Sequence, residues 1–457
     1  MSIKSKYLIW GWLVISIFFS SCKKYLNHPS DKKLTIIETL GDLQSLLDQY
    51  FTINQRDPCL GEPASDNIYL DFSTWQSLDE FERAVYIWQN LNVVWPYSHY
   101  GSGNAWSQCY DIIYKANVVL DNIHKINKDE RNAEVWENIM GQSYFLRGKS
   151  LLQVAWIWSL AYDSVTADED LGIPLRLNAD FNEVSQRATL RRSYEQILED
   201  LIFSAQLLPA EPLNPYRPGK AAAYGYIART YLSMRDYKRA GLYADSALMI
   251  KSNLLDFNAD IAIAERYPFK ALNREVIYVS KMGLSIGLYL SKIDSLFYKS
   301  YEDDDLRKTA FFYTNGDGSY SFRGSYDGSP YPFTGITTDE MYLISMEANA
   351  RLGNITEAAQ LLNALLFARW RTGTYIPFVP ISQQEMIEKI LEERRKELTM
   401  RDLRWIDIKR FNKEDAGIYI RRLLDGNEYV LEPNDLRYAM AIPEDIIERS
   451  GMPQNKR

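Results

Sequence analysis

Histidine and cysteine are scarce in this sequence, with 3 of each among 457 residues. The three histidines, His28, His99 and His124, are too scattered to form an HExxH or another local metal motif. The chain also lacks a G-x-S-x-G elbow, a phosphate-binding P-loop and a dinucleotide fingerprint. We therefore expect no metal, no cofactor and none of the enzyme classes that these motifs mark.

Basic residues are also fewer than acidic ones. Lysine and arginine total 52 against 60 acidic residues, which gives a formal net charge of −8 at pH 7, and no long basic run follows the N-terminal region. Nucleic-acid binding rests on clustered lysine and arginine. We therefore expect no nucleic-acid partner.

A long apolar run occurs at the N-terminus. Tyr7–Phe19 follows two lysines and is too short for a transmembrane helix, which needs about 20 apolar residues. Phe19-Ser20-Ser21-Cys22 then resembles a bacterial lipobox, in which small residues precede a cysteine that is lipidated after cleavage. We predict a signal peptide at residues 1–21 and a lipid anchor on Cys22.

Two cysteines remain after the anchor, Cys59 and Cys109. An oxidising cell envelope permits a disulfide between them. Buried thiols fit the sequence as well, so both alternatives stay open.

Helical spacing of apolar residues predicts a mainly α protein, with a single domain over residues 22–457 and helices at about 34–54, 104–250 and 338–411. Ala221–Leu248 and Asp339–Leu366 each match a tetratricopeptide unit, in which small and large residues alternate so that two antiparallel helices pack closely. The irregular spacing between the two units excludes a continuous solenoid. We predict a tetratricopeptide-like helical scaffold with loop-rich insertions that carry short strands.

The two insertions, at about 55–103 and 251–337, are rich in aromatic residues and turn residues. Flat rings on loops held by a rigid scaffold can stack on sugars and form a shallow, preformed platform. The alternative is that most of these rings cover the helical core. The ligand-binding candidates are Trp75, Trp88, Trp95, Tyr320 and Tyr331.

Charged residues crowd the stretch Ile381–Phe411, between apolar residues at helical spacing. Opposite charges that share one face of a helix can pair, and we expect such pairs to include Glu393 with Arg401. We predict that these charges fix helix packing and that Arg404 and Trp405 are structural.

The same stretch resembles the signature of the SusD/RagB family, surface lipoproteins of outer-membrane nutrient-uptake systems. The matching residues are Glu393-Arg394-Arg395, Glu397-Leu398, Arg404-Trp405, Asp407 and Arg410-Phe411. The family often has Glu-Gly where this chain has Arg401-Asp402. Further landmarks in family order are carried by Lys23–Asn27, Trp106–Leu120, Asp170–Leu175, Leu207–Pro209 and Ala441–Ile446.

The resemblance implies a non-enzymatic lipoprotein on the outer membrane that captures a glycan or an oligopeptide and delivers it to a SusC-like, TonB-dependent barrel. Two other functions stay open. A surface glycoside hydrolase could place its two carboxylates anywhere among the 60 acidic residues. A repeat-scaffold envelope lipoprotein would bind only protein partners.

Overall fold

The computed structural model describes residues 37–89, 104–283, 285–324 and 326–457. Cys22 and Trp95 lie outside these ranges. Among the described residues, no helix combines the length and the apolar character needed to cross a membrane.

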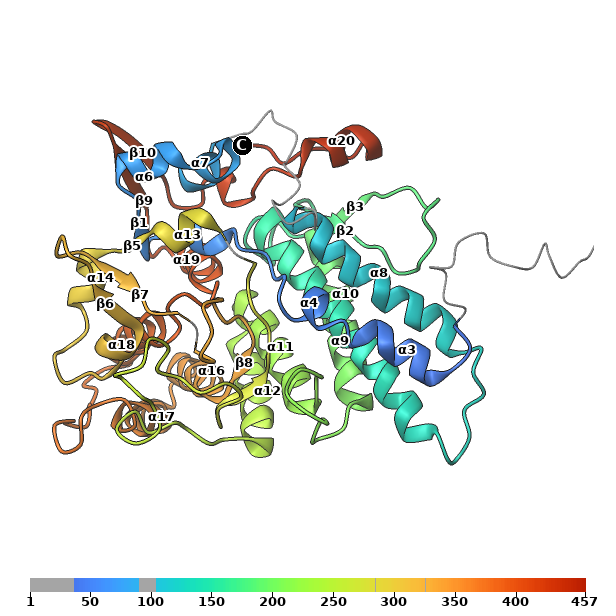
Figure 1. Ribbon diagram of the computed structural model, residues 1–457, viewed down its shortest axis with the longest axis horizontal. Coiled ribbons are helices and arrows are strands. Elements are labelled where there is room, and N and C mark those ends of the chain that lie inside the picture. Colours follow the sequence, from blue (N-terminus) through green and yellow to red (C-terminus); the bar gives the residue numbers. More distant parts are fainter. Residues whose placement is uncertain (1–36, 90–103, 284, 325) are drawn as a thin grey trace, which may run out of the picture.

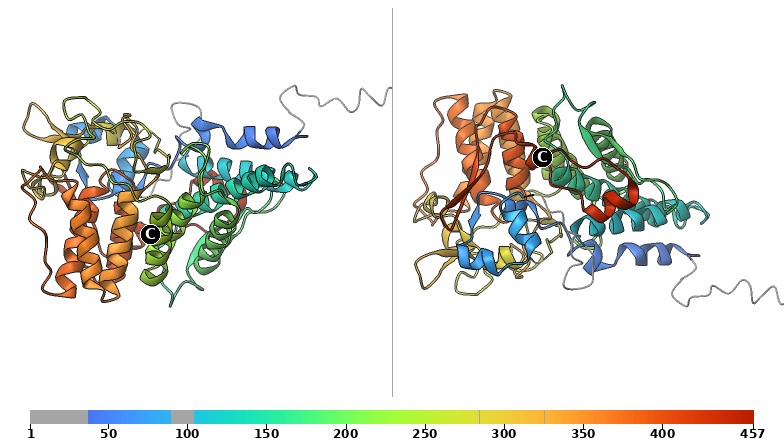
Figure 2. Two further views of the ribbon diagram at one scale, coloured as in Figure 1. Left: turned by 90° about the horizontal axis from the view of Figure 1, so that it is seen from below. Right: turned by 90° about the horizontal axis from the view of Figure 1, so that it is seen from above.

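A run of long helices forms the scaffold (Figures 1 and 2). Helices that follow one another in the chain pack side by side, and α12 packs on α16 although a long insertion separates them. This arrangement confirms the predicted mainly α, tetratricopeptide-like fold. The scaffold helices are α8 (Ala105–Ile123), α9 (Ala133–Trp158), α10 (Leu190–Leu207), α11 (Lys220–Ser233), α12 (Tyr237–Ile250), α16 (Thr338–Arg351), α17 (Ile355–Phe367) and α18 (Gln383–Glu397).

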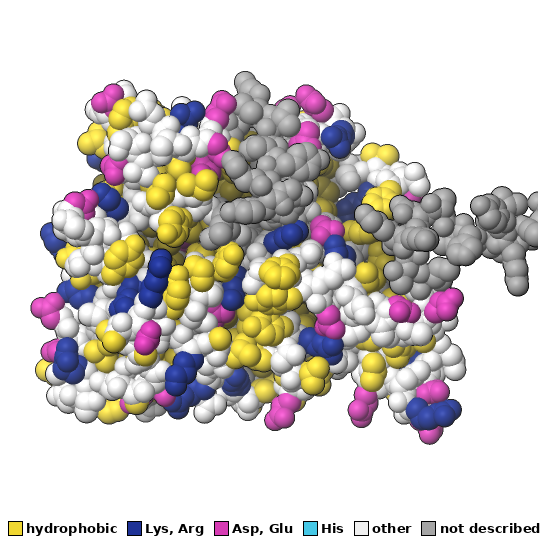
Figure 3. All heavy atoms as spheres, in the orientation of Figure 1, with side chains coloured by type: hydrophobic (Ala, Val, Ile, Leu, Met, Phe, Trp, Pro, Cys, Tyr) yellow, Lys and Arg dark blue, Asp and Glu magenta, His cyan; other side chains and the backbone are white. Residues whose placement is uncertain are grey.

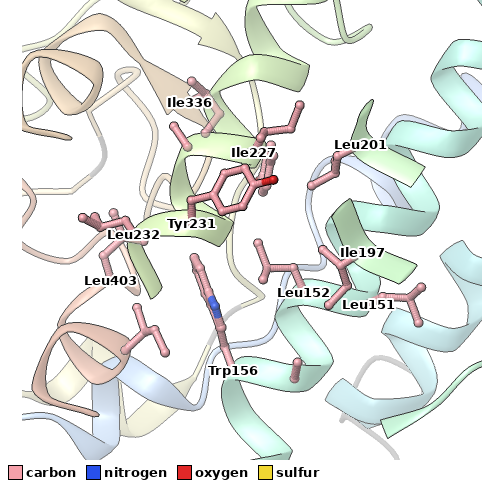
Figure 4. Close-up of a cluster of buried hydrophobic side chains, with 14 of the residues drawn as sticks. Leu151, Leu152, Trp156, Ile197, Leu201, Ile227, Tyr231, Leu232, Ile336 and Leu403 are labelled. Carbon is pink, nitrogen blue, oxygen red and sulfur yellow. The ribbon is translucent and has the colours of Figure 1, made fainter. Parts of the chain in front are cut away.

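Small residues let the scaffold helices approach closely. Ala240, Ala244 and Ala247 of α12 are fully buried, and a Cβ atom added to Gly241 would lie 2.7 Å from Cβ of Ala348 in α16. Larger apolar side chains of α9, α10 and α11 fill the space between those helices (Figure 4). The two predicted repeat units correspond to α11–α12 and α16–α17.

The remaining helices are short and belong mostly to the insertions and the C-terminal region. They are α3 (Leu40–Leu47), α4 (Tyr50–Ile53), α5 (Gly61–Ala64), α6 (Phe72–Ser77), α7 (Glu80–Tyr86), α13 (Ile286–Leu290), α14 (Ser295–Lys299), α15 (Arg307–Phe311), α19 (Arg404–Asn412) and α20 (Glu444–Ser450), with a 3-10 turn at Leu436–Tyr438.

The described strands form two-stranded antiparallel sheets only. The pairs are β1 (Ile68–Tyr69) with β5 (Lys292–Ile293), β2 (Leu171–Pro174) with β3 (Arg187–Thr189), β4 (Val276–Tyr278) with β8 (Ile336–Thr337), β6 (Phe312–Thr314) with β7 (Tyr320–Phe322), and β9 (Ile420–Leu424) with β10 (Asn427–Leu431). The β1–β5 pair joins the first insertion to the second. The two insertions therefore form one layer at the end of the helices (Figure 2).

The insertions have a hydrophobic core of their own. Many aromatic side chains of the second insertion are buried in it, among them Phe269, Phe311, Tyr326 and Phe333. These rings serve packing, as the alternative interpretation of the aromatic loops expected, but they pack in the core of the insertions and do not cover the helical core. Cys59 and Cys109 are both free thiols.

Candidate ligand-binding site

Most of the charged stretch Ile381–Phe411 builds the interior of the protein. It folds into α18 and α19, and Arg410 of α19 donates to Glu347 of the scaffold helix α16 at 2.6 and 2.8 Å. The expected pair of Glu393 with Arg401 is wrong. Glu393 contacts Arg307 at 2.5 Å, because Arg401 follows the end of α18 and turns toward Asp339, 3.7 Å away.

A buried ion-pair network joins this stretch to the second insertion. Arg307 contacts Asp305, Glu393 and Glu397 at 2.5–3.0 Å, and Arg369 bridges Glu397 and Glu275 at 2.7 and 2.8 Å. Burial disfavours the charged form of Glu393, yet Arg307 and two lysines hold its pKa at about 2. Glu393 therefore keeps its charge, whereas burial raises the pKa of Glu275, at the other end of the network, to about 8. The contacts of the network fix the insertion to the scaffold.

The contacts of Arg404 and Trp405 fit the structural roles that we predicted for them. Arg404 binds both carboxylate oxygens of Asp66, at 2.7 and 2.8 Å. The Trp405 ring is 2% exposed and packs on Tyr438 with ring centroids 4.9 Å apart.

The second insertion carries a pocket of about 370 Å³ lined by aromatic side chains, which we call the aromatic pocket. Its rings come from segments far apart in the sequence, and arginines and short polar residues lie between them. Figure 3 shows hydrophobic side chains interspersed with lysine and arginine on the face that carries this insertion. The lining includes Arg266, Tyr267, Ser285, Tyr289, Tyr313, Phe322, Arg323 and Met400.

Two rings of the aromatic pocket are open to solvent. Tyr289 of α13 is 69% exposed and Tyr313 of β6 is 50% exposed. Helix and hairpin hold them in place: Ser285 caps α13 at the Leu288 amide, and β6 pairs in register with β7. Exposed rings on such supports can stack on a ligand without first being uncovered.

Close backbone approach shapes the floor of the pocket. Gly324 has φ +115°, and a Cβ atom there would lie 2.5 Å from Cδ1 of Tyr267. The Arg323 guanidinium donates to the Thr309 carbonyl at 2.9 Å and to the carbonyl of Glu265. The Tyr267 ring thus lines the pocket, and the contacts of Arg323 join its loop and the loop that carries Glu265 to helix α15.

Two of the predicted rings lie near the aromatic pocket without lining it. Tyr320 stacks on Tyr298 with ring centroids 3.4 Å apart, and burial together with this neighbour raises the pKa of Tyr298 to about 12. Tyr331 is half-buried between Pro330 and Pro332, which both line the pocket.

The other predicted rings lie elsewhere. Trp75 of α6 is partly buried, and its Nε1 donates to the Arg83 carbonyl at 3.1 Å. Trp88 is only 2% exposed, and its Nε1 donates to the Ala64 carbonyl at 3.0 Å, so its ring has no free face for a ligand. Trp95 lies outside the described residues.

The residues that sequence reasoning missed are Tyr267, Tyr289, Tyr313 and Phe322. Tyr313 ends a segment with strand character and Phe322 belongs to an aromatic tract, so both carried a regional signal. Which ring of a loop faces outward depends on tertiary contacts, and no periodicity in the sequence reports it.

The acidic run Glu302–Asp305 pairs with cationic side chains of the protein. Asp303 contacts Lys308, Asp304 contacts Arg371, and Asp305 contacts Arg307. In the described part of the chain, no group of three or more His, Cys, Asp and Glu side chains is arranged to hold a metal ion.

Comparison with known proteins places the chain in a family. Residues 24–232 match a family model described as "Starch-binding associating with outer membrane", and residues 296–445 match the model of the SusD family. The two matches do not overlap and together cover more than three quarters of the chain.

Relatives with known sequences or structures agree with these matches. The chain is 27% identical over 154 residues to SusD-like protein P2 of Formosa agariphila, a match that covers 34% of this chain and only 28% of that protein. A SusD superfamily protein from Bacteroides thetaiotaomicron shares the fold with a TM-score of 0.73 at 19% identity, over 92% of this chain and 100% of its own.

A SusD-like carbohydrate binding protein from Bacteroides vulgatus also shares the fold, with a TM-score of 0.66 at 19% identity over 91% of this chain and 97% of its own. At this level of identity the likeness to solved structures concerns the fold alone. The family models cover both the helical scaffold and the charged signature, and on these matches the chain belongs to the SusD/RagB family, whose members are generally carbohydrate-binding proteins of nutrient uptake.

Proposed function

We propose that this chain is a lipid-anchored protein of the outer membrane that captures a glycan in the aromatic pocket and delivers it to a SusC-like, TonB-dependent barrel. An oligopeptide is the alternative cargo. The observation that carries the proposal is the pair of solvent-exposed rings, Tyr289 and Tyr313, held over a pocket by a rigid helix and hairpin.

The chemistry of the pocket suits sugars. Sugar rings present apolar C–H faces that stack on aromatic side chains, while their hydroxyls accept hydrogen bonds from guanidinium groups. Arg266 lies beside Tyr267, with its guanidinium carbon 5.4 Å from the ring centroid, and within the described residues it makes no hydrogen bond or salt bridge. Its donors are therefore available to a ligand.

The lining supports capture rather than hydrolysis. The described residues around the pocket include no Asp, Glu or His, whereas a glycosidase places two carboxyl groups across the scissile bond. Association costs leave a shallow site with modest net affinity. Modest affinity suits a protein that releases its cargo to a transporter.

A panel of soluble polysaccharides separates the functions that the sequence left open. The purified mature protein is run by affinity electrophoresis in gels that contain each polysaccharide, and each mixture is then analysed for shortened products. We expect retardation by at least one polysaccharide with no product. Product formation would establish a hydrolase, and neither retardation nor product would favour a scaffold that binds only proteins.

The anchor has its own test. Cys22→Ala should abolish acylation and release the mature protein in soluble form with its melting temperature unchanged, since the lipid is outside the folded domain. The measurement is cell fractionation after a high-salt wash, in a strain that lacks the barrel partner. A variant that stays in the membrane fraction would contradict the lipobox prediction.

A further inference from the structure

A second and larger hollow borders the insertions. It measures about 1120 Å³ and is bordered by β1, β9, α14 and α18, and it shares no lining residue with the aromatic pocket. Figure 1 shows β1, β9 and α14 along one side of the molecule. We call this hollow the β9 groove.

An unpaired strand edge runs along the β9 groove. Among the described strands, β9 pairs only with β10, through a two-residue loop in which Asp425 and Gly426 have φ of 49° and 78°, as in a type I′ turn. In such a hairpin Leu424 and Asn427 form a hydrogen-bonded pair, so the main-chain groups of Arg421 and Leu423 point away from β10.

These outward groups are free. Within the described residues, the N–H and C=O groups of Arg421 and Leu423 make no hydrogen bond to any partner. Five consecutive residues, 419–423, line the groove although their side chains alternate between the two faces of the strand. A groove that is lined by side chains from both faces of β9 must follow the edge of the strand.

Arginines form the floor of the β9 groove. Arg395 and Arg404 both pair with Asp66, at 3.2 and 2.7 Å. Arg395 uses Nε and Nη2 for its hydrogen bonds and Arg404 uses the same two atoms, so Nη1 of each guanidinium has no partner among the described residues. Two cationic donors thus share one carboxylate and remain open to an anion.

The lining of the whole groove is balanced in charge, with five arginines and five acidic residues, so the excess of positive charge is local to its floor. Arg422 also lines the groove and donates to the backbone carbonyls of Ile68 and Ser65 rather than to a carboxylate. Asp294 is the other acidic group close to Arg395 and Arg422. Burial and the adjacent Arg404 lower the pKa of Arg395 to about 10, as expected where guanidinium groups outnumber carboxylates.

The segments of this chain outside the described residues do not match that charge. Residues 90–103 contain no Asp or Glu, and residues 23–36 carry four lysines against the single Asp31. Neither segment is therefore a match for the arginine floor, which favours an acidic occupant from another molecule. The rim of the groove offers it exposed apolar contacts, since Leu296 and Leu423 are 75% and 73% exposed.

We propose that the β9 groove binds an extended segment of a partner polypeptide, which adds a strand to the free edge of β9 and places an acidic side chain on Arg395 and Arg404. Main-chain hydrogen bonds to Arg421 and Leu423 give affinity in this mode, and the arginine floor gives selectivity. This surface is separate from the aromatic pocket, so the inference does not depend on the proposed glycan capture.

A displayed library of random ten-residue peptides tests the proposal. The library is selected on the wild-type protein and on Leu423→Pro, which removes one outward N–H while the hydrogen bonds between β9 and β10 remain. The matched control is Glu428→Pro, which removes an outward N–H on the far edge of the hairpin, outside the groove. A third selection uses Arg395→Gln.

We expect the wild-type protein and Glu428→Pro to enrich the same peptides, which combine β-branched residues with an acidic one. Synthetic copies should bind Leu423→Pro at least tenfold more weakly, and Arg395→Gln should lose the preference for the acidic residue. Near-UV circular dichroism establishes that each variant is folded. Absence of enriched peptides on the wild-type protein, or equal binding to folded Leu423→Pro, would overturn the proposal.

Discussion

In the helical scaffold Tyr226 and Tyr231 of α11 are buried, and their rings pack on Phe145 of α9 and on Tyr243 of α12. In the second insertion, by contrast, Tyr289 and Tyr313 are exposed to solvent beside a pocket. The two regions contain the same residue type in opposite roles. Close helix packing leaves a scaffold tyrosine no free face, while a loop between turn residues can present one side of its ring.

Charged residues show the same contrast between buried and exposed positions, even two residues apart. Arg369 is fully buried and bridges two carboxylates, while Arg371, two residues later, pairs with Asp304 in an exposed contact. The difference between the regions is therefore one of burial rather than of composition. Substitutions in the buried set should reduce stability, and those at the pocket should reduce binding.

The largest effect should come from Arg369→Ala. Removal of the guanidinium leaves Glu275 and Glu397 buried without this partner, which typically costs about 3–5 kcal/mol of the free energy of unfolding. Arg371→Ala is the matched control and should cost less than about 1 kcal/mol, because its ion pair is exposed. Urea unfolding of the two variants measures both values, and equal losses would contradict the distinction.

The next effect in this order should come from Trp405→Ala, which should lower the free energy of unfolding by about 3–5 kcal/mol, as for other large core aromatics. Its Cβ lies close to Gly61 and its ring packs on Tyr438. The melting temperature should fall while the folded fraction still retains polysaccharide. If the variant instead lost polysaccharide retention at unchanged stability, the family signature would belong to the binding site.

Sequence reasoning recovered the scaffold because helix packing constrains every third or fourth residue. The small residues of α12 and the spacing in α11 are visible in the sequence, and the structure confirms both repeat units. Ion pairs between residues far apart in the sequence could not be predicted from it. Glu393 meets Arg307 from the second insertion, and nothing local to α18 indicates that partner.

The candidate site was recovered only as a region. Tyr320 and Tyr331 are neighbours of the aromatic pocket, but its lining rings are set by the β6–β7 register and by contacts such as that of Gly324 with Tyr267. Trp88 shows the limit most clearly. It follows a short helix in an irregular segment, yet φ of 56° and a hydrogen bond to Ala64 turn its ring into the core.

A smaller, pH-dependent effect is expected at Glu62. Burial raises its pKa from the usual 4.5 to about 7, although hydrogen bonds from Asn67 and the Asp402 amide act to lower it. The folded state then holds a proton that the unfolded chain releases, so this contribution to stability is complete below pH 4.5 and is lost as the pH rises through 7.

Glu62→Gln removes that titration. Between pH 5 and pH 8 the stability of the parent should fall relative to the variant by roughly 1–3 kcal/mol. Denaturant unfolding of both proteins at a series of pH values provides the measurement. Parallel stability profiles would show that Glu62 is ionised in the folded protein throughout this range.

The smallest effect in free energy should come from Tyr313→Ala, and it concerns binding alone. Loss of a ring that stacks on a ligand should cost about 1–3 kcal/mol by analogy with bases stacked on aromatic platforms. We therefore expect retention of the bound polysaccharide to weaken about tenfold, which corresponds to about 1.4 kcal/mol. The melting temperature should stay near that of the parent because half of the ring is already in water. We expect the same weaker retention, at the same melting temperature, for Tyr289→Ala.

Tyr419 supplies a matched control, since it is also 50% exposed but lines the β9 groove instead of the aromatic pocket. Tyr419→Ala should leave polysaccharide retention unchanged in the same affinity gels. Alanine variants of Trp75, Tyr320 and Tyr331 complete the set, because these rings were predicted from the sequence and do not line the pocket. If they lose retention while Tyr313→Ala keeps it, the ligand lies on the neighbouring surface. If every variant binds like the parent, exposed aromatic rings of the insertions do not form the site, and the contrast between buried and exposed tyrosines carries no functional meaning.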